Sequence, residues 1–389
     1  MISIDCELAI ADAIKNKRAL FKFISANDVG QTGSHQYGFY LPKGAWKLFT
    51  SHPPVKGANT DSFVDVVWQR GLVTHSRIVW YGNGTRSEYR LTRFGRDFPF
   101  LHHDNIGSLF ILIPISYVEF RAYVLESEED IAEFQSSLGI EVVGSRGVYE
   151  PGGATAHNSD NCIQTRFDSF AEALLEFPLT KVIATEVQQI LDECIVEFEN
   201  KSPDDKLIRY ITEEYSLFKM IERRLTEPAI TRKFHNIDDF IETAASILNR
   251  RKSRAGKSLE YHVENILKQS GITFDSKPRI DGRVEPDILI PGKAAYEDPS
   301  FPAEKLVIVG VKTTCKDRWR QVLNEGKRIP RKHILTLQQG ISSSQLVEMN
   351  EADVTLIVPE PLHRHYPTKR EISILSLSDF IESIKKITQ

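Results

Sequence analysis

The chain has 389 residues, of which 41% are hydrophobic and 26% charged, as in globular proteins and unlike a disordered chain. Its length favours two domains, and its net charge of −4 excludes an overall basic protein but not a local basic surface. The first residues lack a basic and apolar leader, and no apolar run reaches membrane-spanning length. We therefore expect a soluble cytoplasmic protein with no membrane partner.

The first part of the chain is predicted to be rich in β-strands. Short apolar runs at 78–81 and 109–113 end at turn residues, which is typical of strands. The stretch 147–161 is polar and rich in glycine, which indicates a linker. We therefore predict one domain at 1–160 and a second at 161–389.

The second part alternates helices with strands. Apolar residues recur at helical spacing in four segments and again near the end of the chain, at 180–199, 203–224, 237–248, 257–269 and 377–387. Strand-like apolar runs lie between them, at 287–290, 306–311, 333–337, 354–358 and 372–375. Helices around a central mixed sheet predict an α/β fold for this domain.

A basic run separates two of these helices. Five cations and no acid occur between Asn249 and Lys257, namely Arg250, Arg251, Lys252, Arg254 and Lys257. The run is either a solvated loop or a surface that contacts nucleic acid, and the sequence leaves both interpretations open.

The spacing of the cysteines and histidines gives little indication of a metal site or of disulfide bonds. Cys6, Cys162, Cys194 and Cys315 lack CxxC spacing, which argues against a zinc site and against a disulfide framework. His102, His103 and Asp104 are adjacent and could bind a metal, but no further ligand lies near them in sequence. We predict a surface turn there.

A carboxylate and a lysine bracket two neighbouring apolar runs. Asp287 opens one run and Lys312 closes the next, so adjacent strands could bring both to one edge of a sheet. A divalent cation held by carboxylates, with an ammonium beside the phosphate, suits phosphodiester cleavage. An acid usually stands two residues before such a lysine, but Gly310 stands here, and Glu325 could supply the missing ligand. A solvated helix acid is the alternative for Glu325.

Longer segments resemble a known family. Residues 249–260 (NRRKSRAGKSLE) and 311–321 (VKTTCKDRWRQ) resemble the catalytic domain of the EcoRII-type restriction endonucleases, which are type IIE enzymes. Residues 25–33 (SANDVGQTG) and 90–96 (RLTRFGR) are similar to the N-terminal half of that family. The resemblance thus extends over both predicted domains.

The resemblance implies a restriction-endonuclease-like core of the PD-(D/E)XK type whose second acid is displaced to the helix after the lysine strand. Asp287 and Glu325 would hold Mg²⁺, and Lys312 would contact the scissile phosphate and its water. Glu260 would be an acid on the first core helix near a second metal, or else a helix-surface acid.

The resemblance also implies two DNA-reading regions. In the second domain Lys316, Asp317 and Arg318 would read base edges, because a cation–acid–cation triplet suits guanine and cytosine; a charged helix start capped by Asp317 is the alternative. Arg251, Arg254 and Lys257 would contact the DNA from the basic run.

The first domain would be a β-barrel-like (B3-type) DNA-binding module. Its loop 27–36 and a second element would grip the duplex, through Asn27, Gln31, His35, Gln36, Arg86, Glu88 and Arg90. A salt-bridged strand face is the alternative for the last three.

The function that follows is a type II restriction endonuclease making Mg²⁺-dependent double-strand cuts at a short, near-palindromic G·C-rich site like CCWGG. It would act as a homodimer, bind a second site as allosteric effector and be paired with a cognate DNA methyltransferase. A non-cleaving DNA-binding regulator on a decayed nuclease fold, and a structure-selective repair or junction nuclease, are the alternatives.

Overall fold

The computed structural model describes residues 2–31, 37–85, 87–140, 146–151, 161–367 and 374–388. The chain divides into two compact units. The N-terminal unit comprises 1–153 with the segments 338–347 and 364–372, and the C-terminal unit comprises 154–337, 348–363 and 373–389. Each unit contains one mixed sheet, which confirms the predicted combination of a β-rich and an α/β part.

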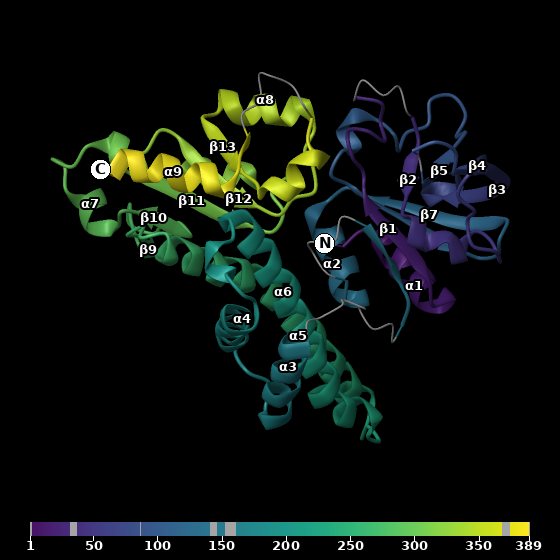
Figure 1. Cartoon of the computed structure of the whole chain (residues 1–389), viewed down its shortest axis with the longest axis horizontal. Helices are drawn as coiled ribbons and strands as arrows, with labels where there is room; N and C mark the ends of the chain where they lie inside the picture. Colours follow the sequence, from purple (N-terminus) through teal and green to yellow (C-terminus); the bar gives the residue numbers. More distant parts are fainter. Residues whose placement is uncertain are drawn as a thin grey trace. The chain divides into compact units, whose positions relative to one another are not determined.

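The N-terminal unit is built on an eight-stranded sheet in the order β2-β5-β4-β3-β7-β6-β1-β8, with all neighbours antiparallel except β3 and β7. Its strands are β1 (Ala19–Phe23), β2 (Phe39–Leu41), β3 (Thr60–Trp68), β4 (Val73–Tyr81), β5 (Glu88–Thr92), β6 (Leu109–Pro114), β7 (Glu119–Leu125) and β8 (Arg146–Tyr149) (Figure 1). Its helices are α1 (Ile4–Asn16), α2 (Glu128–Leu138) and the 3-10 turns η1 (Lys43–Leu48), η2 (Gln69–Gly71) and η3 (His103–Asn105).

Both faces of this sheet are apolar. Alternate residues of a strand point to opposite faces, so Leu20 packs in an aromatic core with Trp68 and Phe110, while Phe21 packs with α1 and α2. The predicted linker is wrong at its start, because Gly147 lies in β8 opposite Phe21. A Cβ at Gly147 would lie 2.6 Å from the Phe21 ring, so the glycine allows this pairing.

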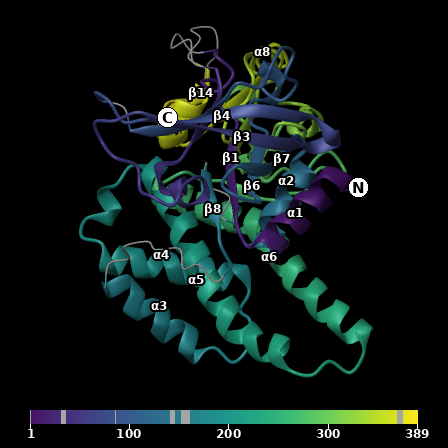
Figure 2. The same cartoon turned by 90° about the vertical axis from the view of Figure 1, so that its right-hand side faces the viewer.

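Long helices form one layer of the C-terminal unit. They are α3 (Asn161–Ala173), α4 (Thr180–Cys194), α5 (Pro203–Thr231) and α6 (Ile237–Gln269), with the turn η4 (Phe198–Asn200) before α5. Figure 2 shows α5 and α6 running beside each other along most of their length. The predicted boundaries therefore need correction, since α4 ends earlier and α5 later than expected and α6 is continuous through the basic run.

The continuity of α6 has an electrostatic cause. Its basic segment faces acids on α5: Arg251 donates to both carboxylate oxygens of Glu222, at 2.7 and 2.8 Å, and Arg254 lies 3.4 Å from Glu214. The helix continues through Gly256, where a side chain would meet no other atom within 4 Å. Of the two interpretations that the sequence left open for this run, the solvated loop is therefore wrong, because the run is part of a helix and its arginines pair with acids on α5.

A six-stranded sheet in the order β14-β13-β12-β11-β10-β9 forms the rest of the unit. The strands are β9 (Asp275–Ser276), β10 (Ile288–Ile290), β11 (Val307–Lys312), β12 (Lys332–Thr336), β13 (Val354–Ile357) and β14 (Ile374–Leu375). The remaining helices of this unit are α7 (Lys293–Glu297), η5 (Ala303–Lys305), η6 (Trp319–Asn324) and α9 (Leu377–Thr388). Two more, α8 (Ser343–Glu351) and η7 (Glu360–His365), contain residues of both units. β9 to β11 pair antiparallel and β11 to β14 parallel, as expected for a mixed sheet.

The prediction of unpaired cysteines is wrong for one pair. Cys162 on α3 and Cys194 on α4 form a disulfide with a Cα–Cα distance of 5.7 Å, whereas Cys6 and Cys315 are free and buried. The packing of α3 on α4 brings together two cysteines that are 32 residues apart, which their spacing could not indicate.

Within the described residues, none of the helices combines the length and the apolar character needed to cross a membrane.

Candidate active site and DNA-contacting residues

Asp287 and Lys312 meet where β10 and β11 pair. Asp287 precedes β10, and its Oδ2 accepts the Val311 backbone N–H at 2.8 Å and the Lys312 ammonium at 2.7 Å. The backbone bond fixes the carboxylate against the end of β11, so that strand pairing itself sets the distance to Lys312. The two side chains are 13% and 27% exposed, which leaves the pair accessible from one side.

Glu325 reaches the same place from another element. It follows η6 in extended conformation, and η6 is a short 3-10 helix where the sequence predicted a longer helix. Its Oε2 is buried and has no hydrogen-bond partner among the residues that the structure describes. Burial raises the pKa of the Glu325 carboxyl; the Lys312 charge opposes the increase, and the Asp287 charge adds to it. Glu325 thus lies within the field of both residues.

The turn after Glu325 is held in place by contacts that the sequence did not indicate. Gly326 has φ +61°, and a Cβ there would lie 2.2 Å from Ile308 of β11, so only glycine fits. Lys332 at the start of β12 donates to the carbonyl of Gly326 at 2.8 Å and to that of Ile329. Asp281 accepts the next backbone N–H, that of Lys327, at 2.9 Å. These contacts fix the backbone from which Glu325 projects.

Gly310 occupies the position where an acid is usual, and space does not require a glycine there. A Cβ at Gly310 would meet nothing closer than 3.9 Å. Steric exclusion therefore does not explain the lack of an acid at position 310.

Glu260 on α6 is paired with Lys277, a residue that sequence reasoning missed. The Lys277 ammonium lies 2.6 Å from Glu260 Oε2. The backbone N–H of Lys277 donates to the carbonyl of Asp287 at 3.1 Å, so this lysine links the helix acid to the β10 acid. Its only sequence signal is its position ten residues before Asp287.

The donor set fits a magnesium ion. Mg²⁺ prefers oxygen ligands, and the Asp287 and Glu325 carboxylates lie near enough for the charge of Asp287 to raise the pKa of Glu325. A buried carboxylate oxygen without a hydrogen bond, such as Glu325 Oε2, is costly unless a ligand compensates it. The residues present therefore suit a cation between these two carboxylates.

The three charged residues after the lysine strand, Lys316, Asp317 and Arg318, differ in how exposed they are. Asp317 and Arg318 are exposed, whereas Lys316 is 8% exposed. Arg318 donates to Thr314 at 3.3 Å. Only the second and third members of the triplet therefore lie on the surface of this structure.

The basic run does not form an open cationic surface. Arg254 is 6% exposed, pairs with Glu214 and stacks over the rings of Tyr215 and Phe218 at 5.0 Å. Arg251 is held by Glu222, as described above. Lys257, by contrast, is exposed. This arrangement corrects the expectation for Arg254 and Arg251, whose charges are compensated by α5 in this structure.

In the N-terminal unit, Glu88 and Arg90 lie on β5. Their side chains are 3.0 Å apart, and Arg90 Nη1 is buried without a hydrogen-bond partner. Asn27 and Gln31 lie after β1, half-buried and exposed respectively. His35, Gln36 and Arg86 lie outside the described residues.

Asp28 organises the loop after β1, another role that sequence reasoning missed. Asp28 is fully buried and accepts hydrogen bonds from the backbone of Ser25 and Tyr40, both at 2.8 Å. The buried ammonium of Lys22 pairs with the same carboxylate. This buried pair ties the start of the predicted DNA-gripping loop to β1 and β2.

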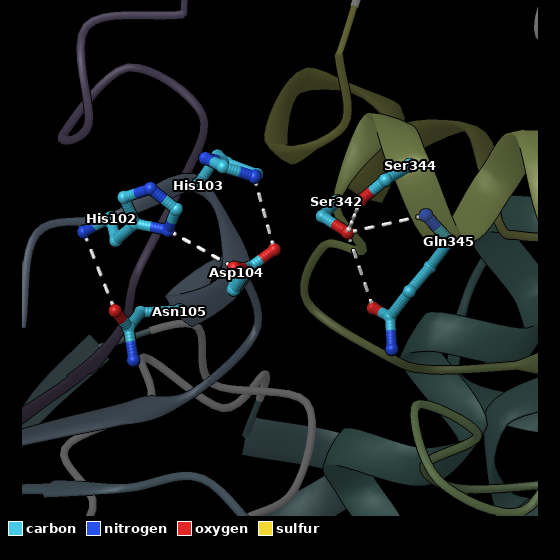
Figure 3. A network of polar contacts seen from close by, with 7 residues as sticks. All are labelled: His102, His103, Asp104, Asn105, Ser342, Ser344 and Gln345. Carbon is cyan, nitrogen blue, oxygen red and sulfur yellow. Dashed lines mark hydrogen bonds and ion pairs between the residues drawn. The ribbon is translucent and has the colours of Figure 1, made fainter.

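His102, His103 and Asp104 lie at η3, and Figure 3 shows both imidazoles turned toward the Asp104 carboxylate. His102 Nδ1 lies 3.1 Å from Asp104 Oδ2, and His103 Nε2 lies 3.1 Å from Asp104 Oδ1. Their side chains are at least 42% exposed, as the predicted surface turn would require.

Comparison with known families identifies both parts of the chain. Residues 13–152 match the family model described as "Restriction endonuclease EcoRII, N-terminal", and residues 218–381 match "EcoRII C terminal". The type II restriction enzyme EcoRII of Escherichia coli is 33% identical over 96% of this chain and 95% of its own length. The type II restriction enzyme SsoII of Shigella sonnei is 24% identical over 38% of this chain and 50% of its own length.

Two complexes with DNA are among the solved structures that match this chain. Metal-depleted Ecl18kI in complex with uncleaved, modified DNA has a TM-score of 0.45 and 20% identity, covering 58% of this chain and 83% of that chain. The complex of PspGI with substrate DNA has a TM-score of 0.45 and 16% identity, covering 54% and 93% respectively.

Proposed function

Because the chain belongs to the EcoRII family of type II restriction endonucleases and is therefore a site-specific deoxyribonuclease, we propose that Asp287, Lys312 and Glu325 form its active site. The observation that carries this proposal is the buried, unpartnered Oε2 of Glu325, in a carboxylate that lies in the field of Asp287 and Lys312. A structural acid in that position would have no reason to remain uncompensated.

Asp287 and Glu325 hold Mg²⁺ in this proposal. When bound, the ion would polarise the scissile phosphate and lower the pKa of an attacking water. The carboxylates orient this site through contacts of the chain itself: the Val311 backbone N–H fixes Asp287, and the pinned turn at Gly326 fixes Glu325.

Lys312 acts on the substrate. Its ammonium, now bonded to Asp287, is on the accessible side of the pair and turns to the phosphate and to the attacking water. There it stabilises the charge that develops on the phosphate oxygens. Water attacks phosphorus in line, and the products carry a 5′-phosphate and a 3′-hydroxyl.

Recognition in the C-terminal unit falls to Asp317 and Arg318, with Lys316 reached only after a local rearrangement. A carboxylate accepts from cytosine N4 and a guanidinium donates to guanine O6 and N7, which suits a G·C-rich site of the CCWGG kind. Lys257 contributes a contact to the DNA backbone.

The N-terminal unit, residues 1–160 in this proposal, binds a second copy of the site as an effector. Arg90 supports this role, since the buried Nη1 without a partner gains an acceptor only when its surroundings change. Glu88 beside Arg90 on β5, and Asn27 and Gln31 in the loop after β1, belong to the expected DNA-contacting set, which His35, Gln36 and Arg86 complete. A homodimer matches the twofold symmetry of such DNA sites, and a cognate methyltransferase in the cytoplasm would protect the host.

Digestion of plasmid DNA by the full-length protein tests the function. We expect discrete fragments with Mg²⁺ and none with EDTA, and sequencing of the fragment ends gives the target and the cut position. A gel shift without cutting under every divalent ion would instead indicate a non-cleaving regulator.

A further inference from the structure

We infer that Lys277 is the exchangeable counter-ion of Glu260, holding in the metal-free protein the carboxylate oxygen that a second divalent cation would otherwise bind. The inference rests on the proposed function, in which Asp287 and Glu325 bind the first cation. It assigns Lys277 as a positioning residue that limits how many cations the site takes up.

The contact between Lys277 and Glu260 is short. The ammonium lies 2.6 Å from Glu260 Oε2, and the two side chains are 51% and 19% exposed. Charge-assisted hydrogen bonds of this length are among the stronger ones in proteins. The limited exposure of Glu260 reduces solvent screening, which makes most lysine–glutamate pairs on surfaces weak.

The backbone of Lys277 is tied to the active site. Its N–H donates to the carbonyl of Asp287 at 3.1 Å, and its φ of +49° is a conformation that a lysine adopts only at a cost. Strained positions of this kind are concentrated at functional sites. The ammonium can therefore leave Glu260 while its Cα stays beside Asp287.

The acids of this arrangement differ in the cations that contact them. Lys312 bonds to Asp287 and Lys277 bonds to Glu260, so each of these two carboxylates is in contact with an ammonium group. Glu325 Oε2 has no hydrogen-bond partner among the described residues, although the charges of Lys312 and Lys332 both act on its carboxyl. The pKa of Lys277 is raised, first by its hydrogen bond to Glu260 and also by the Asp287 charge, so Lys277 lies in the field of both acids.

A second cation must displace Lys277. One carboxylate oxygen does not hold an ammonium at 2.6 Å and a divalent ion in the same place, because the two positive charges repel each other strongly at such distances. The site therefore takes one divalent ion readily and a second only against this ion pair.

Titration of the full-length protein with Mn²⁺ in the absence of DNA tests the inference, with free Mn²⁺ measured by electron paramagnetic resonance. We expect Lys277→Met to tighten the weaker Mn²⁺ site by about tenfold, since a neighbouring positive charge is removed. Lys277→Arg keeps the charge and should bind Mn²⁺ like the native protein.

Two further variants trace the effect to Glu260. Lys277→Met combined with Glu260→Gln should lose the gain, because the freed carboxylate is absent. Lys268→Met is the matched control. Lys268 lies on α6, the helix that carries Glu260; its side chain is 67% exposed, and its ammonium is 4.0 Å from Glu264. This variant should not change Mn²⁺ binding.

The outcomes separate the two proposals. If Asp287→Ala and Glu325→Ala abolish Mn²⁺ binding while Lys277→Met leaves it unchanged or weaker, the assignment of Lys277 is wrong and the active site stands. A gain that persists in the double variant also overturns the assignment. If Asp287→Ala and Glu325→Ala leave Mn²⁺ binding intact, the cation site itself is misplaced.

Discussion

Two groups of charged residues in the C-terminal unit have similar composition and opposite character. In the helical layer, both oxygens of the fully buried Glu214 accept hydrogen bonds, from Ser258 at 2.6 Å and Arg254 at 3.4 Å, and His262 lies 2.6 Å away. At the sheet, Glu325 keeps one buried oxygen without any bond. Both groups contain acids beside cations, but both oxygens of Glu214 are bonded, whereas Glu325 Oε2 has no partner among the described residues.

The pKa values record the same difference. Burial would raise the pKa of Glu214, but the hydrogen bond from His262 and the Arg254 charge outweigh it and leave the pKa lowered. The pKa of Glu325 remains raised because burial is not offset by a donor. A buried carboxylate whose two oxygens are bonded, such as that of Glu214, stabilises the fold, whereas a buried carboxylate oxygen without a donor, such as Glu325 Oε2, is costly unless a ligand compensates it.

The largest expected effect is on catalysis. Asp287→Ala or Lys312→Ala should lower the rate of DNA cleavage by at least about 10³-fold, because each removes a group that acts on the transition state. DNA binding in a gel shift with EDTA should be retained. Cleavage at the native rate by either variant would contradict the active-site assignment.

Glu214→Ala should act on stability instead. It leaves Arg254 and His262 buried without their acceptor, which costs about 3–5 kcal/mol of unfolding free energy. Urea unfolding measures this, with the exposed Glu242→Ala as the matched control. Equal stability of the two variants would remove the structural role of the cluster.

The stabilisation by Glu214 also has a pH signature. Because its pKa is lowered in the folded state, its contribution is present above the ordinary value of 4.5 and is lost as the pH falls through the lowered pKa. The difference in unfolding free energy between the native protein and Glu214→Ala should therefore shrink in acid.

Asp317→Ala extends the comparison to an exposed carboxylate. Losing one base contact should reduce discrimination against a substituted base pair by about 1–3 kcal/mol, without changing Mg²⁺ dependence. Cleavage of a set of single-substituted sites measures this ratio. An unchanged preference at full rate would leave Asp317 an exposed acid without a role in base recognition; the alternative of a helix cap is wrong, because Arg318 is the N-cap residue of η6 and no side chain caps this helix.

The smallest effect is expected for Glu325→Gln without divalent ions. The raised pKa of Glu325 means that its stabilisation is present below 4.5 and is lost as the pH rises through the folded-state pKa. At pH 7 in EDTA, the free energy of unfolding of the glutamine variant should therefore be about 1 kcal/mol higher than that of the native protein. Near pH 4 the two free energies should be equal. A destabilised variant at pH 7 would mean that the Glu325 carboxylate is already compensated.

The sequence predicted the elements whose signal is local. Apolar runs indicated β10, β11, β12 and β13 within a residue or two, and the placement of Asp287 and Lys312 at the ends of two such runs brought them to one sheet edge. Spacing also nominated Glu325, although the helix expected for it is the short turn η6. Periodicity and composition act over neighbouring residues, and these features depend on nothing else.

Only the tertiary structure decided which charges pair. The basic run of α6 has no local acid, and its Arg251 and Arg254 became buried because α5 places Glu222 and Glu214 opposite them. The role of Lys277 could not be seen for the same reason, since its partner Glu260 lies on α6. The energy of a charge in a protein depends on the burial and the partners that distant segments supply, and no local pattern contains that information.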